Sequence, residues 1–598
     1  MPNIRMLLWG ALAALLYLNY EAWLHDYPAA GAPGVAVSAV GTPGSAGLGD
    51  SVPQDASTAA VPPAAGGSST GGSSAAPAAS AFGAPPSADA DAQPANAQPA
   101  NARSEDARSG DAAAPGAGAG APPQLRVVTD VLDVLINLKG GELDQADLTE
   151  YPKRKDTPNI PVRLLSEDPP YLLQTGLFAP AGEAAPTHLA TWSSHEKSFE
   201  LAAGANELRV PLTWTDGHGL NVTKTFVFTR GLYAIGLTYD VENAGTAARK
   251  LAPYSQFLLQ WVHASRSYFD VETYSFKGPA VYDGVKSHDL NVESDTDSKF
   301  SETITNGWLA SLQHQFVSAI IPPRDLPYKY RLQVRDRQYL LSATGPETLI
   351  PAGAKVQFAE KLFVGPKLQS QLAATAPHLE RTVDFGILTV LAQPLFATLN
   401  WVHGLIGNWG WSIIIVTALI KLLFYPLSQA SGRSMAKMRT VGPRMKQIQE
   451  TFKDDREKLG RAMMELYKKE KINPLAGCLP MLVQIPVFIS FYRVLLESVE
   501  MRQAPFLLWV NDLSSRDPWF VLPALMGAAM FAQFKLNPAP PDPMQAKIMQ
   551  FMPLVMTLMM MWFPAGLVLY WLTNTLLTIA QQWRVNQVVE AEAAKPRA

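Results

Sequence analysis

Apolar residues follow different patterns in successive parts of this chain. Between residues 124 and 376 they alternate with polar residues in short runs, which is typical of half-buried strands. After residue 404 they form nearly unbroken runs of about 16 to 21 residues, close to the length that a membrane helix requires. Together these patterns predict a membrane α-helical bundle joined to an all-β sandwich domain.

The clearest alternation lies between Thr225 and Asn243. Phe226 and Phe228 precede the turn residues Arg230-Gly231, and apolar residues resume at every second position after them. This arrangement predicts two antiparallel strands joined by a turn. Similar runs recur through residues 124–376, so we expect a single β-sandwich there. The apolar residues after the turn are Tyr233, Ile235, Leu237, Tyr239 and Val241.

The C-terminal part contains five long apolar segments. An amphipathic stretch precedes them, and it predicts an interfacial helix within residues 377–403. The last three apolar segments are short for a bilayer and would thin the lipid around them, unless their true ends lie a few residues further out. With the N-terminal apolar run they predict six transmembrane helices, five of them in a core of residues 404–584. The five segments are 405–425, 479–496, 520–536, 548–563 and 567–583.

The N-terminal part combines one apolar run with a long polar stretch. Residues 1–26 carry Arg5 before the apolar run, so they fit either a cleaved signal peptide or a retained signal anchor. Residues 27–123 are rich in Ala, Pro, Gly and Ser and have too few large apolar residues for a core. We therefore expect residues 27–123 to be a disordered linker.

Charge is concentrated between residues 428 and 477. This loop has twelve basic and six acidic residues, a net charge of +6, and therefore faces the cytoplasm. Six spans then place both termini in the cytoplasm, with the short tail 585–598, and the β-domain in the periplasm. Apolar residues at helical spacing predict a helical hairpin within the loop, with Asp454 and Asp455 able to cap its second helix and Asn473-Pro474 ending that helix. Its basic face would contact phospholipid headgroups or ribosomal RNA, or would simply be solvated. The basic residues that we select are Lys437, Arg439, Arg444 and Lys446.

A single lysine interrupts the first of the five apolar segments. Lys421 lies about 10 Å inside its boundary, where a charge costs roughly 2.5–3.5 kcal/mol unless water or polar groups surround it. Thr417 shares its face, and Gln484 and Thr573 bring polar groups from other segments. These residues predict a hydrated groove. The alternatives are a lysine that snorkels to the interface and polar residues that only join helices.

Sequence motifs for enzymatic chemistry are missing. Neither a phosphate-binding G-x-x-x-x-G-K-[ST] nor a zinc-binding H-E-x-x-H occurs, and the apolar segments after Lys421 contain no carboxylate. The one cysteine, Cys478, excludes an intrachain disulfide. We therefore expect no catalytic residues, no metal site and no cofactor, and a protein that is not an enzyme.

Several motifs in the C-terminal part resemble the YidC family of membrane protein insertases. They are Asn473-Pro-Leu-Ala-Gly-Cys-Leu-Pro480, Gln484-Ile-Pro486 and Trp562-Phe-Pro-Ala-Gly-Leu-Val-Leu-Tyr570. The resemblance implies a positively charged groove without nucleotide hydrolysis, in which Lys421 takes the place of the family's arginine. It also implies that Thr417, Gln484 and Phe488 line the groove, that Trp562 and Tyr570 lie on the lateral substrate path, and that the N-terminal anchor is retained.

The resemblance further implies a function and partners. The protein would insert and fold integral membrane proteins in the inner membrane, alone or with the Sec translocon. Its partners would be nascent membrane proteins, the translocon, the lipid bilayer and, weakly, the ribosome. A secondary solute transporter with a large periplasmic domain is the alternative, although the inverted repeat that it predicts is not visible. An anchored periplasmic scaffold is a third possibility, but it leaves Lys421 unexplained.

Overall fold

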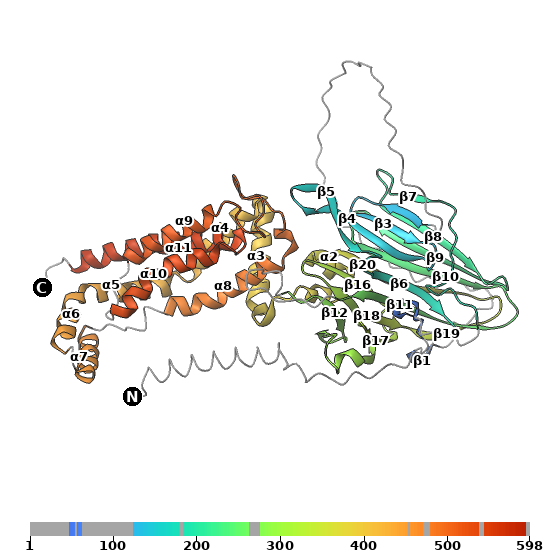
Figure 1. Cartoon of the computed structure of the whole chain (residues 1–598), viewed down its shortest axis with the longest axis horizontal. Helices are drawn as coiled ribbons and strands as arrows, with labels where there is room; N and C mark the ends of the chain where they lie inside the picture. Colours follow the sequence, from blue (N-terminus) through green and yellow to red (C-terminus); the bar gives the residue numbers. More distant parts are fainter. Residues whose placement is uncertain are drawn as a thin grey trace, which may run out of the picture. The chain divides into compact units, whose positions relative to one another are not determined.

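The structure is a computed structural model whose strands and helices gather in two regions of the sequence (Figure 1). The predicted N-terminal anchor and most of the predicted linker lie outside the residues that it describes. These residues are 47–53, 57–61, 124–179, 183–261, 275–452, 455–470, 479–536 and 543–593.

Strands fill the region from Gln124 to Pro366 and, in the described residues, form one sheet of twelve strands and one of eight. The two sheets confirm the predicted β-sandwich. The larger sheet has the order β14 (Ser301–Thr305), β17 (Pro327–Arg335), β18 (Gln338–Thr344), β11 (Arg249–Gln260), β6 (Tyr171–Phe178), β4 (Glu142–Arg154), β3 (Leu132–Asn137), β2 (Gln124–Val128) and β7 (Ser198–Glu200), with β5 (Thr157–Leu165), β19 (Pro346–Ile350) and β1 (Ser57–Val61) attached. The smaller has the order β13 (Ser287–Asp289), β12 (Gly278–Tyr282), β15 (Trp308–Leu312), β16 (Phe316–Ile321), β20 (Lys355–Pro366), β10 (Ala234–Asn243), β9 (Leu220–Thr229) and β8 (Glu207–Thr215).

The predicted hairpin is the pair β9 and β10. The two strands are antiparallel, with Phe226 opposite Leu237 and Phe228 opposite Ile235. The turn between them contains Gly231, whose φ of 71° lies in the left-handed region that glycine tolerates best. Every apolar residue of the predicted alternation is buried, which confirms both the strand period and the face that it packs.

One inward-facing position of β9 holds a lysine instead of an apolar residue. Lys224 is fully buried, and its ammonium donates to the carbonyl oxygens of Gly141 (2.5 Å) and Thr175 (3.2 Å). The charge also lies 5.5 Å from the ring centre of Trp192. Burial lowers the pKa of Lys224 to about 7, against the opposing effect of the carboxylates Glu142 and Glu360. The hydrogen bonds explain how this core accommodates an ammonium group.

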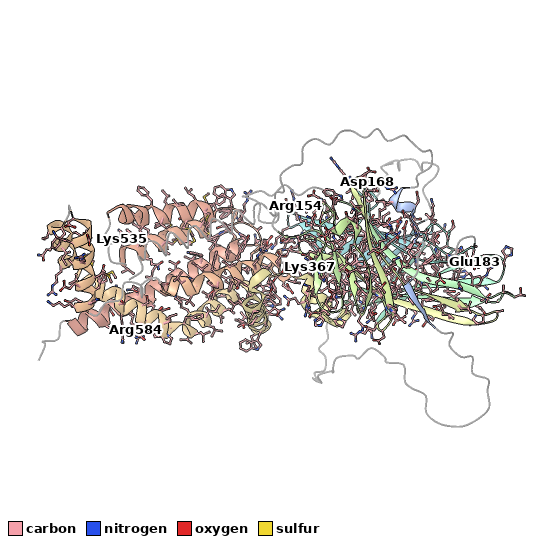
Figure 2. All side chains as sticks on the ribbon, turned by 90° about the horizontal axis from the view of Figure 1, so that it is seen from below. Arg154, Asp168, Glu183, Lys367, Lys535 and Arg584 are labelled. Atoms are coloured by element: carbon pink, nitrogen blue, oxygen red, sulfur yellow. The ribbon has the colours of Figure 1, made fainter. Side chains whose placement is uncertain are left out.

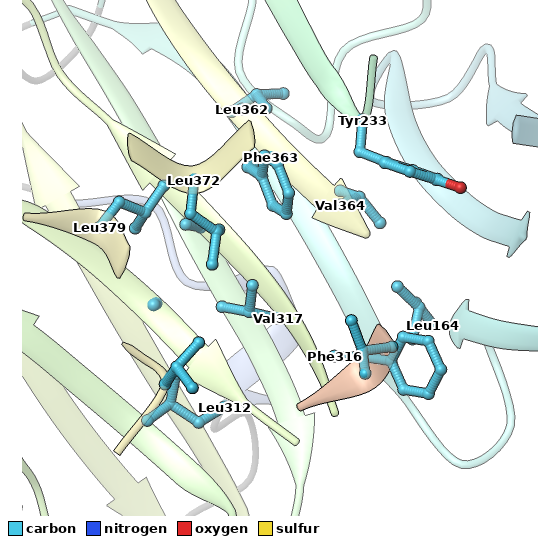
Figure 3. Close-up of a cluster of buried hydrophobic side chains, with 14 of the residues drawn as sticks. Leu164, Tyr233, Leu312, Phe316, Val317, Leu362, Phe363, Val364, Leu372 and Leu379 are labelled. Carbon is cyan, nitrogen blue, oxygen red and sulfur yellow. The ribbon is translucent and has the colours of Figure 1, made fainter. Parts of the chain in front are cut away.

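A dense apolar cluster joins the smaller sheet to the short helices that follow it (Figure 3). Phe316 and Val317 come from β16, and Leu362, Phe363 and Val364 come from β20. The helices α2 (Gln369–Thr375) and η4 (Leu379–Thr382) add two side chains that are completely buried, Leu372 and Leu379. This cluster anchors the segment between the sheets and the long helices.

Part of the predicted disordered linker is ordered. A short 3-10 helix, η1 (Leu48–Asp50), lies against the larger sheet, and β1 pairs in parallel with β19. The prediction of disorder is therefore wrong for these residues. The composition of a segment cannot predict that a few of its residues bind partners more than a hundred positions away in the sequence.

The long helices after the sheets correspond to the predicted apolar segments, with shifted ends. The predicted interfacial helix begins only at Thr389, because η4 and η5 (Gly386–Leu388) occupy the residues before it. The last helix continues to Ala593, nine residues into the predicted tail, because no Gly or Pro interrupts it. The helices are α3 (Thr389–Ile406), α4 (Trp409–Leu423), α5 (Tyr425–Thr440), α8 (Leu479–Glu497), α9 (Val521–Leu536), α10 (Pro543–Met560) and α11 (Ala565–Ala593).

A single helix that crosses a membrane must be both long and apolar. Taken singly, none of the described helices is both long and apolar enough. One pair, Trp409–Leu423 with Tyr425–Ser434, bent by 65° at the break between them, meets the requirements together.

The basic loop forms the two predicted helices, α6 (Gly442–Thr451) and α7 (Arg456–Lys469). Asp455, one of the two aspartates predicted to cap the second helix, accepts with its carboxylate from the backbone N–H groups of Glu457 and Lys458. Val441 and Met445 are buried against Leu466. The predicted helix end at Asn473-Pro474 lies outside the described residues.

Candidate functional site

Lys421 lies in the last turn of α4, and the start of the same helix is firmly fixed. Asn408 caps α4, because its side-chain oxygen accepts from the backbone N–H of Trp411 at 3.1 Å. Its amide nitrogen donates to the carbonyl oxygen of Phe506 at 3.1 Å. One turn before Lys421, Thr417 is buried and donates its hydroxyl hydrogen to the carbonyl of Ile413 (2.6 Å). This hydroxyl therefore offers only its lone pairs to a neighbour.

The ammonium of Lys421 is held by two neutral side chains of α11. It donates to Oδ1 of Asn574 at 3.1 Å and to Oγ1 of Thr578 at 2.8 Å. The Thr578 hydroxyl donates its own hydrogen to the backbone carbonyl oxygen of Asn574 at 2.6 Å. The hydroxyl oxygen can therefore only accept from the lysine. These contacts satisfy two of the three ammonium hydrogens without neutralising the charge.

Among the described residues, no ion pair neutralises the charge of Lys421. In the part of the chain that the structure describes, no carboxylate lies within ion-pair distance of the ammonium. The same residues contain no group of three or more His, Cys, Asp or Glu side chains that could hold a metal ion. The site therefore offers a positive charge and hydrogen bonds, which suit electrostatic binding of an acidic segment.

A small cavity lies beside this lysine, between α4, α5, α8 and α11. It has room of about 40 Å³ for the centres of water molecules, enough for about three waters. The ring of Phe424 and several aliphatic side chains form its apolar walls. The lining is mostly apolar, and the few polar groups in it lie beside the cation. Its polar lining consists of Thr417, Lys421, Ser428, Gln484, Tyr570 and Asn574.

The structure brings together four of the predicted groove residues, namely Thr417, Lys421, Gln484 and Tyr570. The other three do not line the cavity. Phe488 packs behind it, with its ring 6.2 Å from the ring of Tyr570 and 4.8 Å from that of Trp571. Trp562 lies between α10 and α11 and is 41% exposed, and Thr573 is buried elsewhere on α11.

Asn574 and Thr578 are the contacts that sequence reasoning missed as site residues. The sequence shows a polar interruption from Thr573 to Thr578, and Thr573 was selected from it. The useful signal is the spacing, because Tyr570, Asn574 and Thr578 lie four residues apart and share one helix face. Thr573 lies off that stripe, which explains why it does not reach the lysine.

The predicted basic hairpin is described only in part. Arg444 forms an ion pair with Glu470 at 2.6 Å and is 65% exposed at its side chain. The side chains of Lys437, Arg439 and Lys446 lie outside the described residues. Whether this face contacts lipid or RNA therefore stays a prediction.

Family comparisons first define the class of protein. Residues 401–592, which contain the lysine and its cavity, match the family described as 60Kd inner membrane protein. Residues 124–398, which contain both sheets, match the family described as YidC periplasmic domain. The helical part therefore belongs with inner-membrane proteins, and the two-sheet part is a periplasmic domain.

Curated relatives identify the family more closely. The membrane protein insertase YidC of Thioalkalivibrio sulfidiphilus (strain HL-EbGR7) is 46% identical over 81% of this chain and 88% of its own length. That of Pseudomonas putida (strain F1) is 46% identical over 79% of this chain and 85% of its own length. The chain belongs to the YidC membrane protein insertase family. The crystal structure of an active YidC insertase with its first transmembrane domain resolved aligns with 77% of this chain and 92% of its own, at 16% identity and a TM-score of 0.37.

Proposed function

We propose that this chain inserts and helps to fold integral membrane proteins by binding acidic segments of them at Lys421. The observation that carries the proposal is an ammonium held by two neutral acceptors beside a small cavity whose lining includes several polar side chains. A carboxylate at the same place would neutralise the charge, whereas Asn574 and Thr578 only orient it. The third ammonium hydrogen is then available to a carboxylate or a carbonyl of the arriving chain.

The location of the charge supports insertion as the task. A polar segment that enters a bilayer loses its water, and each unsatisfied polar group costs several kcal/mol. A cavity with room for about three waters, together with the side chains of Thr417 and Gln484, offers such a segment hydrogen bonds part of the way across. The neighbouring helices are apolar and pack around the hydrophobic segment that follows.

A topology with six membrane spans completes the proposal. It places the N-terminal segment, α4, α8, α9, α10 and α11 across the inner membrane, with both termini in the cytoplasm. Lys535 in the last turn of α9 and Arg584 in α11 lie toward the end of the bundle from which the hairpin extends (Figure 2). Basic residues at that end fit a cytoplasmic location.

Partners of three further kinds belong to the proposal. The Sec translocon would deliver substrates laterally, the ribosome would contact the basic hairpin weakly, and phospholipid headgroups would contact its exposed arginines, such as Arg444. Solute transport is the less favoured alternative, since the curated relatives are membrane protein insertases.

Site-specific photo-crosslinking tests the groove directly. A photoreactive residue is placed at Thr417 or Gln484, both of which line the cavity. Ribosome complexes that carry a single-span protein with an acidic N-terminal tail are then added to membranes containing the variant. We expect crosslinks between the nascent chain and both positions. Trp562 tests the lateral path in the same way.

Controls come from the exposed faces of the same two helices. Leu422 on α4 is 69% exposed and Ile485 on α8 is 47% exposed. Neither lines the cavity, so we expect little crosslinking of the acidic tail from either position. Equal crosslinking of the tail from cavity and control positions would contradict the proposed groove.

A further inference from the structure

A short segment of the N-terminal linker packs against the larger sheet, and we name the surface that it covers the linker groove. Leu48 is 4% exposed and packs among Leu258 of β11, Leu340 of β18 and Leu172 of β6. Four residues later, Val52 packs against a second cluster of Phe178, Ala252 and Tyr254. Two apolar side chains of one short segment thus occupy two separate apolar sites on the same sheet.

Buried polar side chains of the sheet bind the backbone between these two anchors. Gln174 and His188 donate to the carbonyl oxygen of Gly49 at 3.3 and 3.0 Å. Gln256 donates to the carbonyl oxygen of Ser51 at 3.1 Å. All three side chains are at least 97% buried. Without the segment, these donors would lose their acceptors in a largely apolar groove, which is costly.

Hydrogen bonds around His188 fix the tautomer in which it can donate to the segment. Its backbone N–H donates to the hydroxyl of Tyr254 at 3.0 Å, and Nδ1 lies 2.6 Å from the same hydroxyl. Because a carbonyl can only accept, Nε2 carries the hydrogen that bonds Gly49, and Nδ1 accepts from Tyr254. The sheet thus presents a donor that is already oriented toward a peptide carbonyl.

The glycine that follows Leu48 makes the close approach of the segment to the sheet easier. A Cβ atom on Gly49 would lie 3.1 Å from Cδ2 of Leu258, which is tighter than an ordinary contact. Glycine therefore lets the carbonyl of this residue come within reach of Gln174 and His188. The segment Gly47-Leu-Gly-Asp-Ser-Val-Pro53 has two aliphatic residues four positions apart and a glycine after the first of them, which fits this surface.

We propose that this groove of the β-domain is a peptide-binding site and that residues 47–53 are its built-in ligand. The peptide that it accepts has an aliphatic residue, then glycine, and a second aliphatic residue four positions after the first. The side chains of Gln174, His188 and Gln256 donate hydrogen bonds to the peptide backbone between the two aliphatic residues. The bound segment anchors the linker to the β-domain, and its removal opens the site to a second peptide of the same pattern.

Peptide binding to the full-length chain in detergent tests the proposal. The probe is a fluorescein-labelled synthetic peptide of residues 46–54, followed by fluorescence anisotropy. The chain with its own segment should exclude the probe, because a tethered ligand has an effective concentration in the millimolar range. A variant with both Leu48→Asp and Val52→Asp should bind the probe at least tenfold more tightly than the unaltered chain.

Two further variants separate the groove from unspecific binding. Adding Gln256→Leu to the double variant removes one backbone contact and should weaken probe binding at least fivefold. Val35→Asp with Val37→Asp changes the linker outside the segment and should exclude the probe as the unaltered chain does. Equal probe binding by all variants, or no binding by the Leu48→Asp, Val52→Asp variant, would overturn the proposal.

Cysteine accessibility gives an answer that needs no added peptide. In a Cys478→Ser background, a single cysteine replaces either Leu48 or Val35, and its reaction with a maleimide is timed in the full-length chain. We expect the cysteine at position 48 to react at least tenfold more slowly than the one at position 35. Equal rates would show that the segment is not held in the groove.

Discussion

The ammonium of Lys421 and the hydroxyl of Thr578 lie 2.8 Å apart and join α4 to α11. The hydroxyl hydrogen is already committed to the Asn574 carbonyl, so the threonine oxygen can only accept from the lysine. These hydrogen bonds fix the position of the ammonium group and leave its charge unchanged. The neutral side chains of α11 orient the ammonium, and its charge remains available to a ligand.

The sign of the charge at position 421 should decide which substrates are inserted. Lys421→Arg keeps the charge and adds hydrogen-bond donors, so we expect insertion within about twofold of the unaltered protein. Lys421→Glu would repel an acidic tail, and we expect at least a fivefold loss. A protease-protection assay with reconstituted vesicles measures both. A substrate with a neutral tail is the control, and equal insertion by both variants would contradict an electrostatic role.

Insertion activity should depend on the neutral side chain of Asn574 as strongly as on the charge of Lys421. Asn574→Asp places a carboxylate where the amide oxygen now lies 3.1 Å from the ammonium, so an internal ion pair replaces the attraction for substrate. We expect a loss of insertion similar to that of Lys421→Glu. Thr575→Val alters a buried residue of the same helix that does not line the cavity and should insert normally.

Exchanging the two residues tests this idea more sharply. The double variant Lys421→Asn, Asn574→Lys keeps one cation and one amide in the same cavity. We expect it to recover part of the insertion lost in Lys421→Asn alone, measured with the same acidic-tailed substrate. A swap that performs no better than the single variant would show that the charge acts only from α4.

Sequence patterns predicted those features that depend on neighbours close in the chain. Alternation around Arg230-Gly231 was enough for the β9–β10 hairpin, and a pair of aspartates before an amphipathic run predicted the cap that Asp455 forms. The site was predicted in part, because Lys421 stands out in any apolar segment. Its partner Asn574 was missed because the polar residues were considered as a cluster rather than by helical face.

Features that depend on distant partners were not predicted. The segment around Leu48 resembles the rest of its linker, and its partners Leu258 and Leu340 are more than two hundred residues away. Lys224 occupies a register position that the strand pattern reserves for an apolar side chain. The carbonyl groups of Gly141 and Thr175, which come from other segments, accept from the ammonium and help to make that position suitable for a lysine.

Replacement of Gly410 should destabilise the helical part. A Cβ atom there would lie 2.0 Å from Cδ2 of Phe506, so Gly410→Ala forces the ring or the start of α4 to move. We expect a cost of about 1–3 kcal/mol and a lower thermal midpoint in detergent. Gly404 in α3 has no atom near the corresponding Cβ, so Gly404→Ala should leave the midpoint unchanged or raise it slightly. Equal midpoints for the two variants would contradict this packing.

Apolar packing, rather than the ion pair, should hold α6 against α7. Leu466 is 9% exposed and packs on Val441 and Met445, so Leu466→Ala should cost about 2 kcal/mol. The Arg444–Glu470 pair is exposed, and such pairs contribute between about 0 and 1 kcal/mol. Hydrogen exchange of the α7 amides measures both effects. In Arg444→Gln the α7 amides should exchange at the rate of the unaltered protein. If they exchanged faster than in Leu466→Ala, the ion pair would contribute more than the apolar packing.

Stability of the β-domain should depend on pH through His188. Burial lowers the pKa of this imidazole from 6.5 to about 4, so it stays neutral in the folded protein. Between pH 6.5 and 4 the unfolded chain binds a proton at this residue that the folded chain does not, so the contribution of His188 to stability falls as the pH is lowered. The expected slope is about 1.4 kcal/mol per pH unit. Burial also lowers the pKa of His314 to about 4, which adds to the same trend.

His188→Gln separates the contribution of this residue from that of the others. Glutamine does not titrate, so lowering the pH from 8 to 5 should change the free energy of unfolding of the variant in its favour relative to the unaltered chain. The expected relative change is about 2 kcal/mol. Pulse proteolysis of the full-length chain across a urea series measures the free energy of unfolding at each pH. His314 and the buried carboxylates are present in both proteins and therefore cancel in the comparison. Parallel pH profiles would show that His188 is not held neutral between Tyr254 and Gly49, since only a titration that differs between folded and unfolded chains can separate the two curves.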